Sequence, residues 1–158
     1  MSNTAADLSP AAVARKQRLS VLAKAGDAAL APLFAQFTQA HPIAEYRVLR
    51  AAEVGTSMVR ARAGGSGAPF NLGEMSVTRM SVRLPSGAVG HGYVQGRSKE
   101  AARMVALLDA MAEEGLADAV DSLVVAPLDQ AAQTARAARA AKAAATKVEF
   151  FTMVRGEG

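Results

Sequence analysis

The sequence predicts an α+β protein, with an antiparallel sheet of three to five strands packed by N-terminal helices, a central helix and a long alanine-rich C-terminal helix. Three observations predict this class. Apolar residues recur with helical spacing before about residue 41, alternate with the two-residue period of strands between about residues 46 and 95, and regain helical spacing after Ser98. A chain of 158 residues can bury one sizeable core. We therefore expect a single domain over residues 1–158, with residues 1–8 disordered.

Two helices are predicted before the sheet. Ser9-Pro10 supplies an N-cap followed by proline at the first helical position, and this helix should end near Lys24. The second helix has an apolar face at offsets 0, 3, 4 and 7, formed by Leu30, Leu33, Phe34 and Phe37. Because Pro32 fits poorly inside a helix, we expect the start to lie nearer Ala31 than Asp27.

Four strands are predicted next, over residues 46–50, 56–63, 73–84 and 89–95. Glu53-Val54-Gly55 is interpreted as a turn between the first two strands. Pro85-Ser86-Gly87 is a tight reversal, so the last two strands should form an antiparallel hairpin.

Helical spacing returns at Ser98, which can cap a helix that ends at Gly115. The stretch Leu123-Val124-Val125 is expected to be a short strand or an extended segment. Residues 128–146 then predict a long helix, whose alanine surface yields little burial energy by itself and should pack on something larger, such as another subunit. The predicted buried face of the central helix consists of Ala101, Met104, Val105, Leu108 and Met111.

The C-terminal stretch 147–156 is unusually apolar for a terminus and holds two of the five phenylalanines. We expect it either to complete the sheet of this protein or to dock into a partner, and the sequence leaves both alternatives open.

Positive charge is concentrated in the middle of the chain. From Arg47 to Arg103, nine Lys or Arg residues stand against three Glu residues, a net charge of +6 in a chain whose total is +4. Eight of the nine are arginines, which favours two-pronged pairing with an anionic ligand or an acidic partner. A solvated basic sheet face is the alternative explanation.

The candidate site is the stretch 59–79, where a glycine-rich connection joins two strand-like runs. Strand alternation places Met58, Arg60 and Arg62 on one face and Val59 and Ala61 on the other. The glycines could present backbone N–H groups to an anion, or could serve only the turn of a hairpin. The candidate anion or subunit contacts are Arg60, Arg62, Gly64, Gly65, Gly67, Glu74, Arg79, Arg97, Phe150, Phe151 and Arg155. Within this set, Glu74 and Arg79 could act as an acid–base pair or form an ordinary salt bridge.

Several kinds of chemistry are excluded or disfavoured. The chain has no cysteine, which removes disulfides, thiolate metal sites and cysteine nucleophiles. His41 and His91 are fifty positions apart, and no hydrolase elbow, phosphate-loop lysine motif or dinucleotide fingerprint occurs. We predict no metal site and no catalytic residue. With no apolar run of membrane-spanning length and no secretory pattern, we expect a soluble, cytoplasmic protein without membrane contact.

A set of short motifs, taken together and in order, resembles the PhnG family of bacterial phosphonate-utilisation proteins. The resemblance runs from about Val21 to Gly156, although residues 1–20 and the alanine-rich stretch 131–145 add nothing to it. The motifs are Arg50-Ala51-Ala52-Glu53 with Gly55, Ala61-Arg62 with Gly64-Gly65, Gly67 and Phe70, Gly73-Glu74 with Thr78-Arg79, Tyr93-Val94-Gln95-Gly96-Arg97, Ala126-Pro127-Leu128-Asp129, and Val148-Glu149-Phe150-Phe151-Thr152-Met153-Val154-Arg155-Gly156.

The resemblance implies a subunit of the carbon–phosphorus lyase core complex, with PhnH, PhnI, PhnJ and PhnL as partners and a second copy of the chain as a further candidate. It implies a role in displacing adenine from ATP by methylphosphonate, which gives α-D-ribose 1-methylphosphonate 5-triphosphate. ATP would be a substrate of the complex, and no cofactor is expected on this chain alone. The family's nucleosidase-like chemistry is associated with PhnI, so no self-contained active site is expected here.

A different class of function competes with this one. The basic sheet could belong to a stand-alone module that binds RNA or another polyanion. The low aromatic content weakens that alternative. Tyr46, Phe70 and Tyr93 give few aromatic rings on any one face for RNA bases to stack on. The family resemblance itself predicts no nucleic-acid partner.

Overall fold

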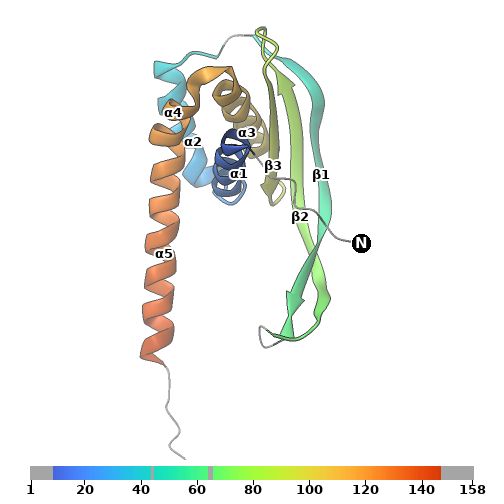
Figure 1. Cartoon of the computed structure of the whole chain (residues 1–158), viewed down its shortest axis with the longest axis vertical. Helices are drawn as coiled ribbons and strands as arrows, with labels where there is room; N and C mark the ends of the chain where they lie inside the picture. Colours follow the sequence, from blue (N-terminus) through green and yellow to red (C-terminus); the bar gives the residue numbers. More distant parts are fainter. Residues whose placement is uncertain (1–8, 44, 64–65, 147–158) are drawn as a thin grey trace, which may run out of the picture.

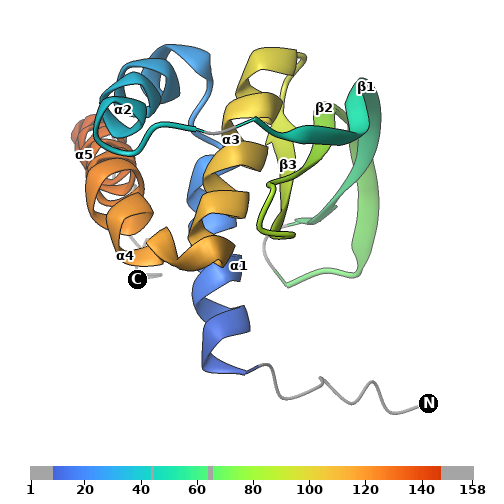
Figure 2. The same ribbon diagram turned by 90° about the horizontal axis from the view of Figure 1, so that it is seen from above.

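The computed structural model describes residues 9–43, 45–63 and 66–146. Its helices lie on one face of a three-stranded antiparallel sheet, and none of the described elements covers the other face (Figure 1 and Figure 2). The predicted α+β class is confirmed. The expectation of disorder for residues 1–8, and the two alternatives for the stretch 147–156, concern segments outside the described residues.

Helices α1 (Pro10–Leu22) and α2 (Asp27–Ala40) form the N-terminal layer. The first has the predicted cap, with the Ser9 hydroxyl accepting from the backbone N–H of Ala12 at 3.3 Å. The prediction that α2 starts near Ala31 is wrong, because the helix begins at Asp27 and contains Pro32. The Asp27 carboxylate, which accepts from the Ser98 hydroxyl at 2.7 Å, holds the first turn in place.

The sheet has the order β1 (Arg47–Arg62), β2 (Pro69–Arg83) and β3 (Val89–Gln95). The predicted hairpin of the last two strands is confirmed. The predicted turn at Glu53-Val54-Gly55 is wrong, since these residues pair continuously with β2. Register shifts between Val48 and Glu53 bend β1 without interrupting it, so one long curved strand stands where two were expected.

The ribbon of β1 and β2 is longer than the rest of the sheet. β3 pairs only with residues 77–83 of β2, so residues 56–62 and 69–76 form a two-stranded extension, hereafter the arm. Figure 1 shows the arm continuing past α1, α2 and α3. No residue from 53 to 76 belongs to the hydrophobic core or packs against it among the described residues. The arm is therefore an appendage of the folded body.

Helix α3 (Lys99–Met111) lies directly on the sheet and supplies more residues to the core than any other element. Its predicted buried face is confirmed, and the whole run from Met104 to Met111 is buried. The approach is close because Gly90 and Gly92 face it from β3. A Cβ atom added at Gly90 would lie 1.9 Å from the carbonyl oxygen of Ala106, and one at Gly92 would lie 1.9 Å from that of Ala102. Glycine at these two positions sets the distance between helix and sheet.

The chain turns after α3 and stays helical. The predicted end at Gly115 is confirmed as a reversal, since this glycine has φ of 117° within the turn Ala112–Leu116. Helix α4 (Ala117–Val120) and a π-helical turn (Asp121–Val125) lead into α5 (Ala126–Ala145). The prediction of a strand or extended segment at residues 123–125 is wrong, because these residues belong to the helical turn Asp121–Val125, in which Val124 is buried in the core.

The outer edge of β3 is partly capped by side chains and by the residue that follows α1. Arg15 donates to the backbone carbonyl of Val89 at 3.3 Å, and the Asp109 carboxylate accepts from the backbone N–H of His91 at 2.8 Å. At the far end of the strand, the N–H of Gln95 donates to the carbonyl of Ala23 at 2.9 Å. These contacts satisfy backbone groups that an edge strand otherwise offers to another chain.

Candidate functional site

The uncovered face of the sheet carries a small ion-pair network. Arg79 of β2 lies opposite Glu53 of β1 and donates to its carboxylate at 3.1 Å. Arg50 reaches the same carboxylate at 3.4 Å. All three side chains are about half exposed, so the network remains open to solvent. The sequence considered Glu74 as the partner of Arg79, whereas the structure provides Glu53.

Further polar groups continue along this face. The hydroxyl of Ser81 and Nδ1 of His91 are 2.9 Å apart across the β2–β3 pair. Arg47 and Arg83 lie directly opposite each other at the next position, and Glu45 borders the same shallow depression of about 390 Å³. The bare face is therefore rich in arginine and hydrogen-bonding groups, which suits contact with an anion or an acidic protein surface.

The arm carries the second group of predicted residues. Arg60 and Arg62 are exposed while Val59 and Ala61 are half-buried, as alternation predicts. The guanidinium of Arg62 donates to the carbonyl of Gly67 at 3.1 Å, which ties the tip of the arm together. Arg60 lies seven residues along β1 from Glu53, the partner of Arg79, or about 23 Å at the rise of a strand. The structure thus separates the arm arginines from Arg79.

The other predicted positions are scattered. Glu74 lies on the arm opposite Met58, and Arg97 is exposed just after β3. The remaining candidates lie outside the described residues: Gly64, Gly65, Phe150, Phe151 and Arg155.

Two arginines of α1 form ion pairs that the sequence reading missed. Arg15 holds the fully buried Asp109 with hydrogen bonds of 3.0 and 2.7 Å, and Arg18, only 5% exposed, binds Asp121 at 2.7 and 2.9 Å. The hydrogen bond that each arginine donates to its carboxylate partner raises the pKa of that arginine. These pairs fasten α1 to the rest of the fold. The sequence could have indicated the first pair. Asp109 directly follows Leu108, a residue of the predicted buried face of the central helix, and a buried carboxylate needs a cationic partner.

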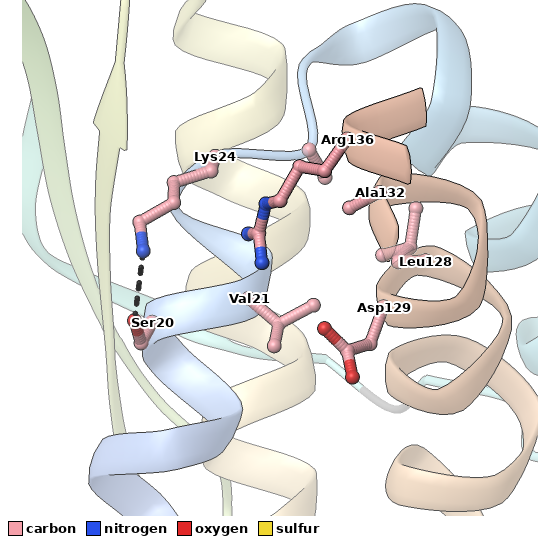
Figure 3. A pocket seen from close by; sticks show the side chains of 8 residues that line it. Ser20, Val21, Lys24, Leu128, Asp129, Ala132 and Arg136 are labelled. Carbon is pink, nitrogen blue, oxygen red and sulfur yellow. Dashed lines mark hydrogen bonds between the residues drawn. The ribbon is translucent and has the colours of Figure 1, made fainter. Parts of the chain in front are cut away.

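A pocket of about 270 Å³ lies between α1 and α5 (Figure 3). Lys24 and Arg136 lie near each other at its rim, Asp129 lies on the α5 side, and Val21 and Leu128 provide apolar surface. Lys24 donates to the Ser20 hydroxyl at 3.2 Å. The pocket lies at the carbonyl end of α1, where the helix dipole disfavours an anion. We therefore place the candidate contacts on the sheet and the arm instead.

Comparison with known families decides the classification. The family model described as phosphonate metabolism protein PhnG matches residues 13–156. The chain belongs to the PhnG family. A curated relative from Rhizobium meliloti (strain 1021), alpha-D-ribose 1-methylphosphonate 5-triphosphate synthase subunit PhnG, is 44% identical over 117 residues, which is 72% of each chain.

The match covers every described helix and strand except the first three residues of α1, and it includes the arm and α5. Within the described part of this PhnG-family chain, no group of three or more His, Cys, Asp or Glu residues is arranged to hold a metal ion. None of its described helices is long and apolar enough to span a membrane.

Proposed function

We propose that this chain is a subunit of an enzyme assembly that transfers the ribose triphosphate of ATP to methylphosphonate and releases adenine. The product is α-D-ribose 1-methylphosphonate 5-triphosphate. The observation that carries the proposal is the 44% identity to a relative named as a subunit of the synthase of this compound, together with the family match over residues 13–156.

The proposed role is a binding one. The described polar groups form an open arginine network, one exposed Ser–His contact and buried structural ion pairs. A substitution at the ribose anomeric carbon needs a cradle for the triphosphate and help for the departing adenine. We assign that chemistry to the assembly with PhnI, PhnH and PhnL, in a larger complex that also holds PhnJ, and we assign no catalytic residue to this chain.

Reconstitution tests the proposal. PhnH, PhnI and PhnL are combined with ATP and methylphosphonate, with and without this chain, and adenine release is followed by chromatography. We expect release only when the chain is present, and none from the chain alone. Full turnover by the partners without it, or turnover by the isolated chain, would contradict the proposed role.

The bare arginine-rich face of the sheet is the one observation that favours the RNA- or polyanion-binding alternative. Titration of the isolated chain with single-stranded and double-stranded RNA separates the two functions. Tight, salt-sensitive RNA binding by a chain that does not support adenine release would favour the alternative.

A further inference from the structure

Two parts of the structure extend from the folded body without cover. One is the arm, and the other is the free half of α5, residues 133–145. Every side chain from Gln133 to Thr146 is exposed, and the last buried residue of α5 is Leu128. Figure 1 shows the arm and α5 reaching toward the same end of the molecule. The same chain thus offers two long, unsupported surfaces that extend in one direction from opposite sides of the helical body (Figure 2).

The arm is not stabilised as a free-standing ribbon. A two-stranded ribbon is marginally stable in water unless a further strand or a helix packs on it. This one also exposes apolar side chains, because Met58, Phe70 and Leu72 are 51%, 45% and 63% exposed. Several large apolar side chains on one unsupported element are typical of a protein contact surface.

The arm and the free half of α5 carry the same sign of charge. The arm has Arg60 and Arg62 against Glu74, and the free half of α5 has three basic residues and no acidic one. Together they hold five basic residues and one acidic residue, a net charge of +4. Like charges oppose closure of the two surfaces on each other, and they equally oppose docking of a second copy by the same surfaces. The basic residues of α5 are Arg136, Arg139 and Lys142.

We propose that the arm and the free half of α5 form one docking site for an acidic protein subunit, which presents carboxylates around an apolar patch. Alternation places Met58, Arg60 and Arg62 on one face of the arm, with Glu74 opposite Met58, so this face combines one large apolar side chain with two guanidinium groups and one carboxylate. Phe70 pairs with Ala61 and lies on the other face. Guanidinium groups pair carboxylates in a two-pronged geometry, which fixes orientation as well as attraction. This inference rests on the proposed function, since its partner is a subunit of the synthase assembly.

Charge reversal on each surface tests the site. Arg60→Glu/Arg62→Glu changes the arm, and Arg136→Glu/Arg139→Glu changes α5. We expect each pair to weaken binding of the labelled chain to the co-purified PhnH–PhnI–PhnJ assembly by about tenfold or more at low salt, with a smaller loss at high salt. The matched control is Lys16→Glu/Lys99→Glu, which makes the same reversal of charge at two exposed positions of the folded body, on α1 and α3. We expect the control to change the affinity by less than about threefold.

Folding and binding are separated by a second measurement. Because all of the altered side chains are exposed, each variant should melt like the unaltered chain. If a reversed pair fails to fold, the neutral pairs Arg60→Gln/Arg62→Gln and Arg136→Gln/Arg139→Gln take its place, with a smaller expected loss in the same direction. If the unaltered chain fails to join the assembly, the proposed function fails. If it joins and the reversed pairs bind equally well, only this inference fails.

Zero-length carbodiimide cross-linking identifies the groups that the docked partner presents, because it joins a lysine to a carboxylate in direct contact with it. Lys142 of α5 and an Arg62→Lys variant of the arm supply the amines. We expect cross-linked peptides that contain Asp or Glu of another subunit, from both positions. Cross-links only between two copies of this chain, or an RNA that co-purifies and is lost on charge reversal, would overturn the proposal.

Discussion

Gly90 and Gly92 set the contact between the sheet and the helix that forms the core. Replacing Gly90 by alanine puts a Cβ atom 1.9 Å from one backbone atom of α3 and 2.4 Å from another. Neither is the end of a flexible side chain, so helix and strand must separate. We expect Gly90→Ala to lower the free energy of unfolding by about 3 kcal/mol, measured by urea denaturation. Gly55→Ala is the control, because nothing lies within 4 Å of the added atom. Equal stability of the two variants would show that α3 does not lie where the structure places it.

Substitution of Arg79 tests whether this side chain contacts a ligand or another subunit. Its ion pair with Glu53 is half exposed, so Arg79→Ala should change the stability of the isolated chain by less than about 1 kcal/mol. We expect the variant to lower the yield of assembled complex and to leave triphosphate affinity per assembled complex unchanged. If Arg79 binds the ligand, that affinity should instead fall by about 1.5–3 kcal/mol, and Arg79→Lys should restore only part of it. A variant that assembles, melts and binds like the unaltered chain would contradict both roles.

Glu100 gives a pH dependence at the start of α3. A hydrogen bond from Arg103 lowers the pKa of the Glu100 carboxyl below its ordinary value of 4.5. The folded pKa is the lower one, so the pair stabilises the fold above the unfolded pKa and loses that contribution as the pH falls through the folded value. The contribution of this pair to the free energy of unfolding is small because Glu100 is 59% exposed. Titration by NMR should show the low pKa, and Arg103→Met should return it toward the ordinary value. An unchanged titration in the variant would show that Arg103 is not the cause.

The arm can be tested as an element. Thr56 and Ser76 are opposite each other, so residues 57–75 can be replaced by an Asn-Gly turn that closes a shorter hairpin. None of the described residues in this range belongs to the hydrophobic core. We expect the shortened chain to keep the melting temperature of the body within a few degrees and to lose binding to the partner subunits. A chain that no longer folds cooperatively would show that the arm supports the body.

The sequence predicted an element correctly where the residues that determine it lie close to one another along the chain. The helix caps Ser9 and Ser98 and the hairpin between β2 and β3 follow from neighbouring residues. The errors had distant causes. The first turn of α2 is held by a hydrogen bond that Ser98 donates to Asp27, and the continuity of β1 depends on pairing with a strand some twenty residues later. The partner of Arg79 required the register of β1 against β2, which spacing within one strand does not reveal.

Several surfaces of the described structure are not covered by any other part of the fold. The arm, the free half of α5 and the bare sheet face together leave large apolar groups such as Leu72 and Tyr93 exposed. We expect the isolated chain to self-associate as its concentration rises, and to give a single heteromeric species when co-expressed with its partner subunits. Size-exclusion chromatography with light scattering checks this prediction. A monodisperse monomer that ignores the partners would contradict it.

The short length of β3 also determines where a sheet built from this chain could grow. Among the described elements, β1 is one edge along its whole length, and residues 69–76 of β2 form a second edge because β3 pairs only with residues 77–83. At β3 itself, Arg15, Asp109 and Ala23 bind three backbone groups, so a strand from another molecule would add more readily beside β1 or beside the arm part of β2. Two copies joined along β1 would still expose the outer edge of the arm on each side. Cover of the arm by a partner subunit would therefore also protect the protein against edge-to-edge polymerisation.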